Sequence, residues 1–465
     1  MPSDFVLAKL DFSNAFNSLH RKDMLLATLD RLPELYAYIF SAYSAPSNLF
    51  FGSHRLASNE GPQQGDPLGP LLFCLTIHPL LLSLESELIL GYLDDLTVAG
   101  NPDTVAKDIS RIQSQGQAMG LTLNINKCEL IADSGTSVTD ALLASFTRIP
   151  PEEASLLGAP LFQGQTLDVE WGKRCDELGK ASDRLHLVGS QSAIILLRSS
   201  FGAPRVQHLL RCSPSHDHVS LVSFDNLLRS TLNNIVNANL SDAQWTQASL
   251  PIRDGGLGVR RISVLALPAF LASNESTRCL QDTILSKRPC SPDKNVLLCQ
   301  TFWSQLHGPQ PAGSAASKQS AWDRPGILAD RAMIELSLNN PRQKALFLAA
   351  EATHSGDWLY ALPIAACGLA LDDEAIRVAV AMRLGLDVCA AHPCRCGADV
   401  DVWGTHSFIC KRAQGRIIRH QVLNDIISGD PRESTFLFQR LSVALQRFNS
   451  ILLHQLFVVD EALDI

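Results

Sequence analysis

Two adjacent aspartates interrupt an apolar stretch of the chain, LILGYLDDLTVAG at residues 88–100. The runs Leu88–Leu93 and Leu96–Ala99 have the length and apolar character of strands, and the break between them predicts a β-hairpin. Asp-Asp is a poor hairpin turn because adjacent carboxylates repel each other. A solvated turn is one interpretation. The other is a bound divalent cation, because Mg²⁺ prefers carboxylate oxygens and shares them with substrate phosphates.

The length and composition of the chain limit its architecture. With 465 residues, of which 46% are hydrophobic, the chain is too long for one core and predicts two or three domains. The sequence predicts neither a signal peptide nor a membrane span, because it has no basic start followed by an apolar run and no apolar run of spanning length. The formal net charge of −8 argues against wholesale nucleic-acid binding but is compatible with a local basic surface.

The first 165 residues alternate strand-like and helix-like segments, which predicts an α+β fold with one sheet and helices packed against it. We expect strands at Phe5–Asp11 and around Leu121–Ala132, and a strand or hairpin at Asn48–Ser58. We expect helices at Arg21–Ala42 with a break at Pro33, at Pro67–Leu84 and at Asp103–Met119.

The rest of the chain has a mostly helical pattern. Residues 172–211 are helical and hold seven Lys or Arg against three acids, which is compatible with a solvated face or a nucleic-acid contact. Residues 306–326 are rich in Gly, Pro, Ala and Ser and predict a linker at a domain boundary. Further on, a cap at Asp372 or Asp373 and a stop at Gly385 predict a helix that leads into a cysteine cluster.

A third carboxylate, Asp11, ends an apolar strand in LAKLDFSNAFNSLH. An ordinary helix cap is one interpretation. In the other, Asp11 and the acidic pair hold two cations about 3.5–4 Å apart, which stabilise the attacking and leaving oxygens of phosphoryl transfer. Between these acids lies EGPQQGDPLGPLLF, a loop that opens a helix, with Gln64 and Gly65 where the backbone can approach a nucleotide.

Four motifs resemble a known family. In order along the chain they are LDFSNAFNS, GPQQGDPLGPLLF, GYLDDLTVAG and GLTLNINKCEL. This order resembles that of the palm motifs of reverse transcriptases, and the residues of the motifs resemble those of eukaryotic retrotransposons of the non-long-terminal-repeat type. The resemblance implies an intracellular, nuclear RNA-directed DNA polymerase. It also implies two Mg²⁺ (or Mn²⁺) ions, an RNA template, a DNA primer and deoxynucleoside triphosphates. The implied fold is a palm at residues 1–165 and a helical thumb at 166–265.

The resemblance assigns catalytic roles to four residues. Asp11 and Asp94 match metal ligands, and Asp95 supports or completes the site. Lys127, in NINKCE, matches a lysine that protonates the pyrophosphate leaving group, and a surface lysine is the alternative.

The resemblance also assigns contacts with the substrates. Phe16 matches an aromatic residue that would collide with a ribose 2′-hydroxyl, and a core phenylalanine is the alternative. Gln64 and Gly65 match the loop that contacts nucleotide and template. SLLGAPL, residues 155–161, resembles the turn that holds the primer end, and the basic helices after it would contact duplex phosphates. LPIRDGGLGVRRI, residues 250–262, resembles a segment found after the thumb, for which the sequence suggests no mechanism.

The cysteine cluster has the pattern C-x-C-x₉-H-x₃-C. Its four members are Cys394, Cys396, His406 and Cys410, and spare candidates are Cys389, His392 and His420. Four soft ligands within seventeen positions suit one tetrahedral Zn²⁺, although the first pair is more closely spaced than usual and buried thiols are the alternative. The resemblance favours zinc, because a similar cluster follows the polymerase in many such elements. The basic residues Lys411, Arg412, Arg416 and Arg419 follow and predict RNA or DNA binding.

The pattern departs from the family at both ends. Only ten residues precede Asp11, where these enzymes place a fingers subdomain, and the nuclease-like region expected after the cysteine cluster is absent. We therefore expect a fragment of low activity, with a connector and linker at 266–330, a helical zinc region at 331–430 and a tail at 431–465. The alternative is a non-catalytic remnant that acts as a nucleic-acid-binding or interaction protein. The sequence does not predict the oligomeric state of the chain.

Overall fold

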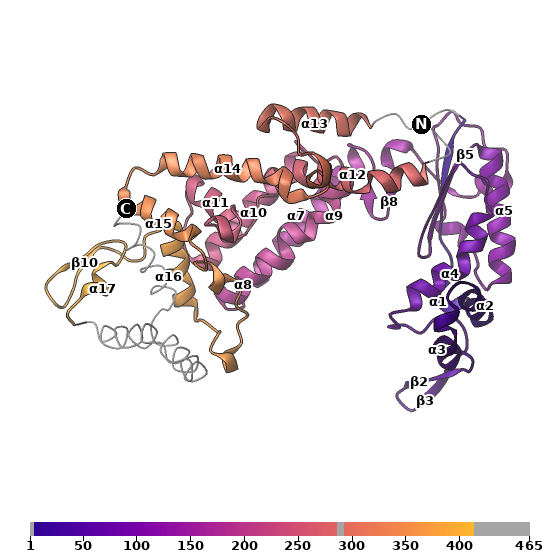
Figure 1. Cartoon of the computed structure of the whole chain (residues 1–465), viewed down its shortest axis with the longest axis horizontal. Helices are drawn as coiled ribbons and strands as arrows, with labels where there is room; N and C mark the ends of the chain where they lie inside the picture. The colour runs from indigo at the N-terminus through magenta and orange to yellow at the C-terminus, as the bar shows by residue number, and fades with distance from the viewer. Residues whose placement is uncertain (1–3, 286–292, 413–465) are drawn as a thin grey trace. The chain divides into compact units, whose positions relative to one another are not determined.

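The computed structural model describes residues 4–285 and 293–412. The chain divides into two compact units, of which unit 1 is Met1–Thr166 with Thr277–Asp293 and unit 2 is Leu167–Ser276 with Lys294–Ile465 (Figure 1). Unit 1 is a mixed α+β unit and unit 2 is mostly helical, which confirms the predicted fold class. None of the helices in the described ranges is both long and apolar enough to cross a membrane.

A five-stranded sheet forms the centre of unit 1, with the order β4-β5-β1-β6-β7. The strands are β1 (Val6–Leu10), β4 (Leu88–Tyr92), β5 (Asp95–Gly100), β6 (Glu129–Ile131) and β7 (Thr147–Ile149). All neighbours are antiparallel except β6 and β7. Alternate residues of β1 are fully buried, so that one face of the strand packs on the core.

Two helices cover that face of the sheet. Phe73 and Ile77 of α4 (Gly69–Leu82) and Ile109 of α5 (Pro102–Ala118) share one buried apolar cluster with β1 and β5. Figure 1 shows α5 running beside β5. The helices predicted at these positions are confirmed, because their apolar residues recur at helical spacing and a side-chain cap, Asn101, begins α5.

A smaller layer of unit 1 follows β1. It contains α1 (Ala15–Ser18), α2 (Arg21–Arg31), α3 (Pro33–Tyr43) and a hairpin of β2 (Ser47–Phe51) and β3 (His54–Ser58). The predicted break at Pro33 is confirmed, because proline lacks an amide donor and suits the first position of a helix. The predicted hairpin is also confirmed.

The strand expected around Leu121–Ala132 is wrong in most of its length. Only β6 pairs as a strand, Leu123 makes a single bridge to Phe12, and Ile125–Lys127 forms a 3₁₀ turn. The backbone N–H groups of Lys127 and Cys128 both donate to the carbonyl of Asn124. Asparagine favours such turns, and here its local preference outweighs the apolar alternation.

Unit 1 also contains α6 (Ala141–Ala144) and a short pair, β8 (Ser155–Leu156) with β9 (Ala159–Pro160). The helices of the rest of the chain are α7 (Gln165–Leu185), α8 (Ser190–Leu196), α9 (Ala203–Cys212), α10 (Val219–Val236), α11 (Asp242–Ser249), α12 (Ile262–Ile284), α13 (Lys294–His307), α14 (Gln319–Ser337), α15 (Pro341–Glu351), α16 (Asp373–Leu384) and α17 (His406–Ile409). A short pair, β10 (His392–Pro393) with β11 (Asp399–Val400), lies near α17 in sequence. The predicted α16 is confirmed, with Asp372 as its cap and Gly385 in the left-handed conformation at its end.

The linker expected at 306–326 is wrong in its second half. Helix α14 begins at Gln319, and Trp322 is buried against Trp303 with the ring centroids 4.9 Å apart. The stretch belongs to unit 2 on both sides. Its composition was misleading because the Gly, Pro and Ala residues surround a tryptophan that needs a packing partner.

The segment 250–262 is a structural junction of unit 2. The guanidinium of Arg383, which is 1% exposed, donates to two carbonyls of this segment, those of Ile252 at 2.7 Å and Gly256 at 3.0 Å. It also donates to the carbonyl of Ser355, outside the segment, at 3.2 Å. Burial lowers the pKa of Arg383 to about 10. A Cβ on Gly256 would lie 2.0 Å from the carbonyl oxygen of Leu250, so only glycine fits there.

Helix α14 is tied to the same segment by ion pairs. Arg260 contacts Asp323 at 2.8 Å, Arg261 contacts Asp330, and Arg324 contacts Asp254. The segment for which the sequence suggested no mechanism therefore connects α14 and α16 through buried or half-buried charges.

Candidate functional site

Strand register determines where the acidic residues lie. Leu10 of β1 is paired with Leu96 of β5, so Asp11 and Asp95 occupy the next positions at the same end of the two strands. The hairpin turn consists of Leu93 and Asp94, and Asp95 already pairs with Tyr92. The expected Asp94–Asp95 turn is therefore displaced by one residue, and Leu93 adopts a positive φ of 58°.

The three carboxylates interact electrostatically. The pKa of Asp95 is raised above its ordinary value by partial burial and by the charges of Asp94 and Asp11, while Lys9 opposes the shift. A cation would offset this repulsion, and carboxylate oxygens are a donor set that suits Mg²⁺ or Mn²⁺. Within the described ranges, however, the three aspartates do not gather as tightly as the cysteine cluster does.

A pocket of about 570 Å³ opens beside these strands. Asp11, Asp95 and Lys127 line it, together with Leu157 and Gly158 of the turn predicted to hold a primer. Asp94 does not line the pocket. The structure thus brings two of the three aspartates and the predicted proton donor around one hollow, although they lie far apart in the sequence.

The wall of this pocket contains an ion pair that the motifs did not predict. Lys9 of β1 contacts Glu129 of β6, with Nζ and Oε2 2.5 Å apart. Lys9 precedes Asp11 by two residues, and residues two apart on a strand point to the same face. This alternation is the sequence feature that identifies Lys9 as a neighbour of the acidic site.

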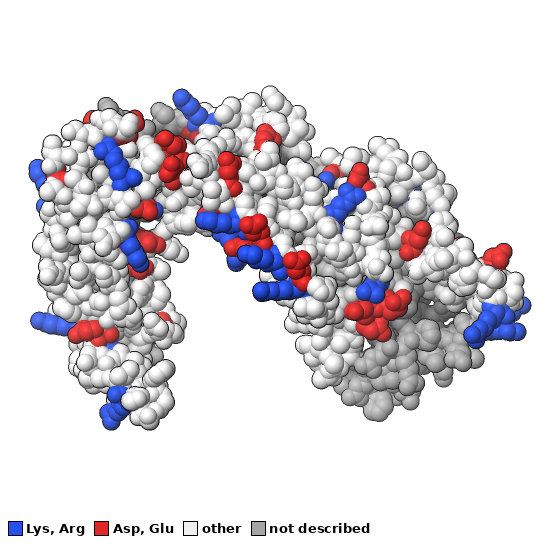
Figure 2. Space-filling view, turned by 180° about the vertical axis from the view of Figure 1, so that it is seen from behind, with Lys and Arg blue, Asp and Glu red and all other residues white. Residues whose placement is uncertain are grey.

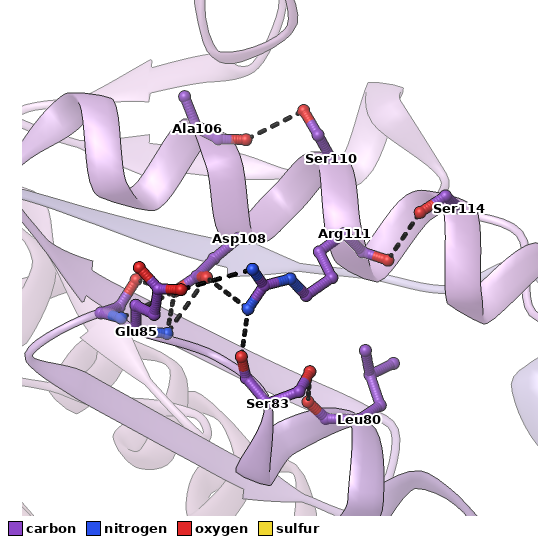
Figure 3. A network of polar contacts seen from close by, with 9 residues as sticks. Leu80, Ser83, Glu85, Ala106, Asp108, Ser110, Arg111 and Ser114 are labelled. Carbon is purple, nitrogen blue, oxygen red and sulfur yellow. Dashed lines mark hydrogen bonds and ion pairs between the residues drawn. The ribbon is translucent and has the colours of Figure 1, made fainter.

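A buried carboxylate on α5 holds the start of the acidic hairpin. Asp108 is 1% exposed and accepts hydrogen bonds from the backbone N–H groups of Glu85 and Ser86 and from the Ser86 hydroxyl. Figure 3 shows Arg111 beside Asp108, where its guanidinium also donates to the carbonyl of Ser83. Because β4 begins at Leu88, this network fixes where the hairpin leaves α4.

The predicted nucleotide-contacting residues lie outside this pocket. Phe16 is half-buried and stacks on Phe73 with the ring centroids 4.5 Å apart, so it also serves as a core residue. Gln64 and Gly65 are exposed, and Gly65 has a positive φ of 89° with nothing within 4 Å of the position of a Cβ. They form the tip of an open loop.

The primer-end motif forms a tight turn. In the segment 155–161, β8 and β9 pair around Leu157 and Gly158, both of which have positive φ. Leu157 is 40% exposed although it is apolar.

The basic helical region carries a mixed charge. On α7, Lys173 contacts Glu170 at 2.5 Å and Arg174 contacts Glu177 at 3.0 Å, and Arg205 of α9 contacts the same Glu177. On the face drawn in Figure 2, Lys and Arg side chains are likewise interspersed with Asp and Glu among the described residues. The excess of basic residues predicted from composition is therefore partly neutralised by ion pairs.

The cysteine cluster converges as predicted. The ligand atoms of Cys394, Cys396, His406 and Cys410 all lie within 4.8 Å of one another, the closest such group of metal-binding side chains within the described residues. The sulfurs of Cys394 and Cys410 are 3.7 Å apart, and the Cys396 sulfur is 3.0 Å from Nε2 of His406. Tetrahedral zinc with Zn–S bonds of about 2.3 Å places two sulfurs about 3.8 Å apart, so the first distance fits and the second needs a small expansion.

One thiol of the cluster favours its charged form, whereas burial and side-chain hydrogen bonding raise the pKa of Cys396. The backbone N–H and the thiol of Cys396 donate to Cys394 and lower the pKa of Cys394 to about 6. A thiolate is the form that binds metal. Of the spare candidates, Cys389 donates to the carbonyl of Asp401 at 3.3 Å, His392 is exposed, and neither belongs to the cluster.

Several predicted residues lie outside the described range. They are Arg416, Arg419 and His420, together with the tail at 431–465. Lys411 and Arg412 are described and exposed.

Comparison with known proteins agrees with the motifs. Residues 2–161 match the family described as reverse transcriptase (RNA-dependent DNA polymerase). The chain is also similar to the retrotransposable element SLACS 132 kDa protein of Trypanosoma brucei gambiense, at 27% identity over 285 residues. That match covers 58% of the chain and 23% of the relative, so the chain spans less than a quarter of the length of this relative. These findings confirm the predicted resemblance to a reverse transcriptase of a non-long-terminal-repeat retrotransposon, and the family match lies in residues 2–161.

Proposed function

We propose that the chain acts as an RNA-directed DNA polymerase of a non-long-terminal-repeat retrotransposon. The observation that carries this proposal is the register of β1 and β5, which sets Asp11 beside Asp95 at the edge of a pocket. The substrates are deoxynucleoside triphosphates, an RNA template and a DNA primer. The family match of residues 2–161 supports this assignment.

The acidic residues provide the ligands of the proposed site. Asp11 and Asp94 hold two divalent cations, Mg²⁺ or Mn²⁺, and Asp95 completes the ligand set. When bound, such ions stabilise the attacking and leaving oxygens of phosphoryl transfer. The pKa of Asp95 is raised by burial and, in smaller part, by the charges of Asp94 and Asp11, and a nearby cation would offset the repulsion from these two acids.

Other residues act on the substrates. Lys127, exposed in the pocket wall, donates a proton from Nζ to the departing pyrophosphate. Phe16 excludes a ribose 2′-hydroxyl and so selects deoxynucleotides. Gln64 and Gly65 contact the incoming nucleotide and the template, and the turn at 155–161 holds the primer end.

The remaining regions bind nucleic acid. Residues 166–265 act as a thumb whose free basic side chains contact duplex phosphates, and residues 266–330 connect it to the helical zinc region at 331–430. Cys394, Cys396, His406 and Cys410 hold one structural Zn²⁺ beside Lys411 and Arg412, which contact RNA or DNA. The chain works in the nucleus, where its target DNA is found.

Primer extension tests the proposal. The purified chain is given oligo(dT) annealed to poly(rA), dTTP and Mg²⁺, and the products are resolved by length. Incorporation that is lost in Asp94→Ala and kept in Asp30→Asn, an exposed acid on α2, is the expected result. Binding of primed template without incorporation in either Mg²⁺ or Mn²⁺ would contradict the proposal and favour a non-catalytic nucleic-acid-binding protein.

A further inference from the structure

A buried tyrosine is hydrogen-bonded to the loop that carries Gln64 and Gly65. Tyr43, at the end of α3, is 3% exposed. Its phenol donates a hydrogen bond to the carboxylate of Asp66 and accepts one from the backbone N–H of Gln63 at 3.1 Å. The two residues that flank the exposed tip are therefore bonded to one buried oxygen.

Asp66 also closes the loop on its helical side. Its second carboxylate oxygen accepts the backbone N–H of Leu68 at 2.8 Å, just before α4 begins at Gly69. At the other end of the loop, Gly61 has a φ of 64°, and a Cβ there would lie 2.0 Å from the carbonyl oxygen of Phe16. The loop thus has fixed ends and a free tip.

A buried arginine completes this frame. Arg21 is 6% exposed and donates to the carbonyl of Gly61 at 3.0 Å, to the carbonyl of Ala45 at 3.3 Å and to the hydroxyl of Ser58 at 3.0 Å. Ala45 precedes β2 by two residues, and Ser58 is the last residue of β3. The guanidinium also lies over the ring of Tyr43, 5.3 Å from its centroid.

We propose that Arg21, Tyr43 and Asp66 are positioning residues that fix the loop 61–69, so that Gln64 and Gly65 meet the incoming nucleotide in one geometry. The proposal rests on the proposed function of this loop. Its physical basis is that a small misplacement of a contacting group is costly in rate and affinity, and that Gln64 and Gly65 are exposed while the residues beside them are hydrogen-bonded to Tyr43. Arg21 also links the β2–β3 hairpin to the loop, because its guanidinium donates hydrogen bonds to Ser58 of the hairpin and to Gly61 of the loop.

Tyr43→Phe is the sharpest test, because it removes one oxygen and keeps the ring over Arg21. Tyr38→Phe is the matched control, since Tyr38 is on the same helix and is 67% exposed. Hydrogen exchange followed by mass spectrometry measures the amides of 61–68, and amides of β1 and β5 serve as the internal reference. We expect about 3- to 10-fold faster exchange in the loop for Tyr43→Phe, as for a lost hydrogen bond, and no change in the reference or in Tyr38→Phe.

A binding measurement separates positioning from simple stabilisation. We expect Tyr43→Phe to weaken the binding of a non-hydrolysable dTTP analogue to the chain on poly(rA)/oligo(dT) by about 3- to 10-fold, with unchanged affinity for the primed template itself. Arg21→Lys keeps the charge but loses the fork, and should give the same pattern.

The outcomes distinguish this proposal from the proposed function. Unchanged loop exchange in both Tyr43→Phe and Arg21→Lys would overturn the positioning role, whether or not the chain binds nucleotide. Loss of affinity for nucleotide and primed template alike would also overturn it, because that result indicates general destabilisation. A wild-type chain that binds no nucleotide while Tyr43→Phe loosens the loop would count against the proposed function and would overturn the assignment of the loop to nucleotide.

Discussion

Leu10 on β1 lies opposite Leu96 on β5, and this pair brings together acids that are more than eighty residues apart in the sequence. Because the strands are antiparallel, the residue after Leu10 faces the residue before Leu96. Those residues are Asp11 and Asp95. A shift of the register by one residue would turn the side chains of one strand to the other face of the sheet and separate the two carboxylates.

Asp95→Asn should change how the stability of metal-free unit 1 depends on pH. The folded-state pKa of Asp95 is raised above its unfolded value of about 3.9. The stability contributed by its protonated form is therefore fully present below the unfolded pKa and is lost as the pH rises through the folded-state pKa. Asparagine cannot ionise, so the variant should gain stability relative to wild type as the pH rises from about 4 to 7.

Urea unfolding monitored by pulsed hydrogen exchange of β5 peptides measures this difference. The effect is expected to be small, because Asp95 is exposed. Asp30→Asn controls for the loss of one charge. If the free energy of unfolding of Asp95→Asn falls relative to that of wild type as the pH rises, the pKa of Asp95 is not raised in the folded state.

Asp108→Asn should destabilise unit 1. Oδ2 of Asp108 accepts the Ser86 donors, while Oδ1 accepts from the backbone N–H of Glu85 and faces Arg111; an asparagine would put an NH₂ group, which cannot accept, at one of these buried positions. We expect a loss of about 1–3 kcal/mol in the free energy of unfolding. Asp103→Asn, at the exposed start of the same helix, should cost less than about 1 kcal/mol. Equal effects of the two variants would mean that Asp108 does not anchor the hairpin.

Zinc content tests the cysteine cluster. The wild-type chain purified under reducing conditions should carry one Zn²⁺, and Cys410→Ser should carry little, because serine is a poor ligand for zinc. Cys367→Ser, an exposed free thiol in unit 2, should keep the metal. Trp403 packs under Arg342 at 5.2 Å, so tryptophan fluorescence should change when a chelator removes the ion. Zinc retained by Cys410→Ser would contradict the assigned ligand set.

Arg383→Met should be among the most damaging substitutions in unit 2. It leaves the carbonyls of Ile252, Gly256 and Ser355 buried without their donor, at a cost of about 3–5 kcal/mol. Arg184→Met, at an exposed position on α7, should change stability by less than about 0.5 kcal/mol. All six tryptophans lie outside residues 1–166, so fluorescence during urea unfolding reports on unit 2. A cost for Arg383→Met below about 1 kcal/mol would contradict the junction role.

Local patterns in the sequence predicted most elements of unit 1. Short apolar runs identified β1 and the β4–β5 hairpin, and Pro33 marked the boundary between α2 and α3. The displaced turn at Leu93 could not be predicted, because leucine prefers a negative φ. Strand pairing nevertheless places Leu93 in the turn with a positive φ. Tertiary pairing outweighed local turn chemistry at that residue.

The candidate site was only partly predictable for a related reason. Motif spacing identified Asp11, Asp95 and Lys127, which line one pocket, but spacing carries no information about partners from distant strands such as Glu129. Asp108 shows the same limit. It interrupts the apolar stripe of α5 between Val105 and Ile109, a pattern that marks a buried polar residue but does not identify the backbone groups that it binds.

Binding of Mn²⁺ tests the central claim most directly. The chain on poly(rA)/oligo(dT) with a non-hydrolysable dTTP analogue is titrated with Mn²⁺, and electron paramagnetic resonance counts the ions and detects magnetic coupling between them. Two coupled ions are predicted for wild type and for Asp30→Asn, because two cations about 3.5–4 Å apart share the aspartates. Asp11→Asn and Asp94→Asn should each abolish the coupling. Wild type that binds no coupled pair, or an Asp11→Asn variant with the wild-type spectrum, would contradict the account.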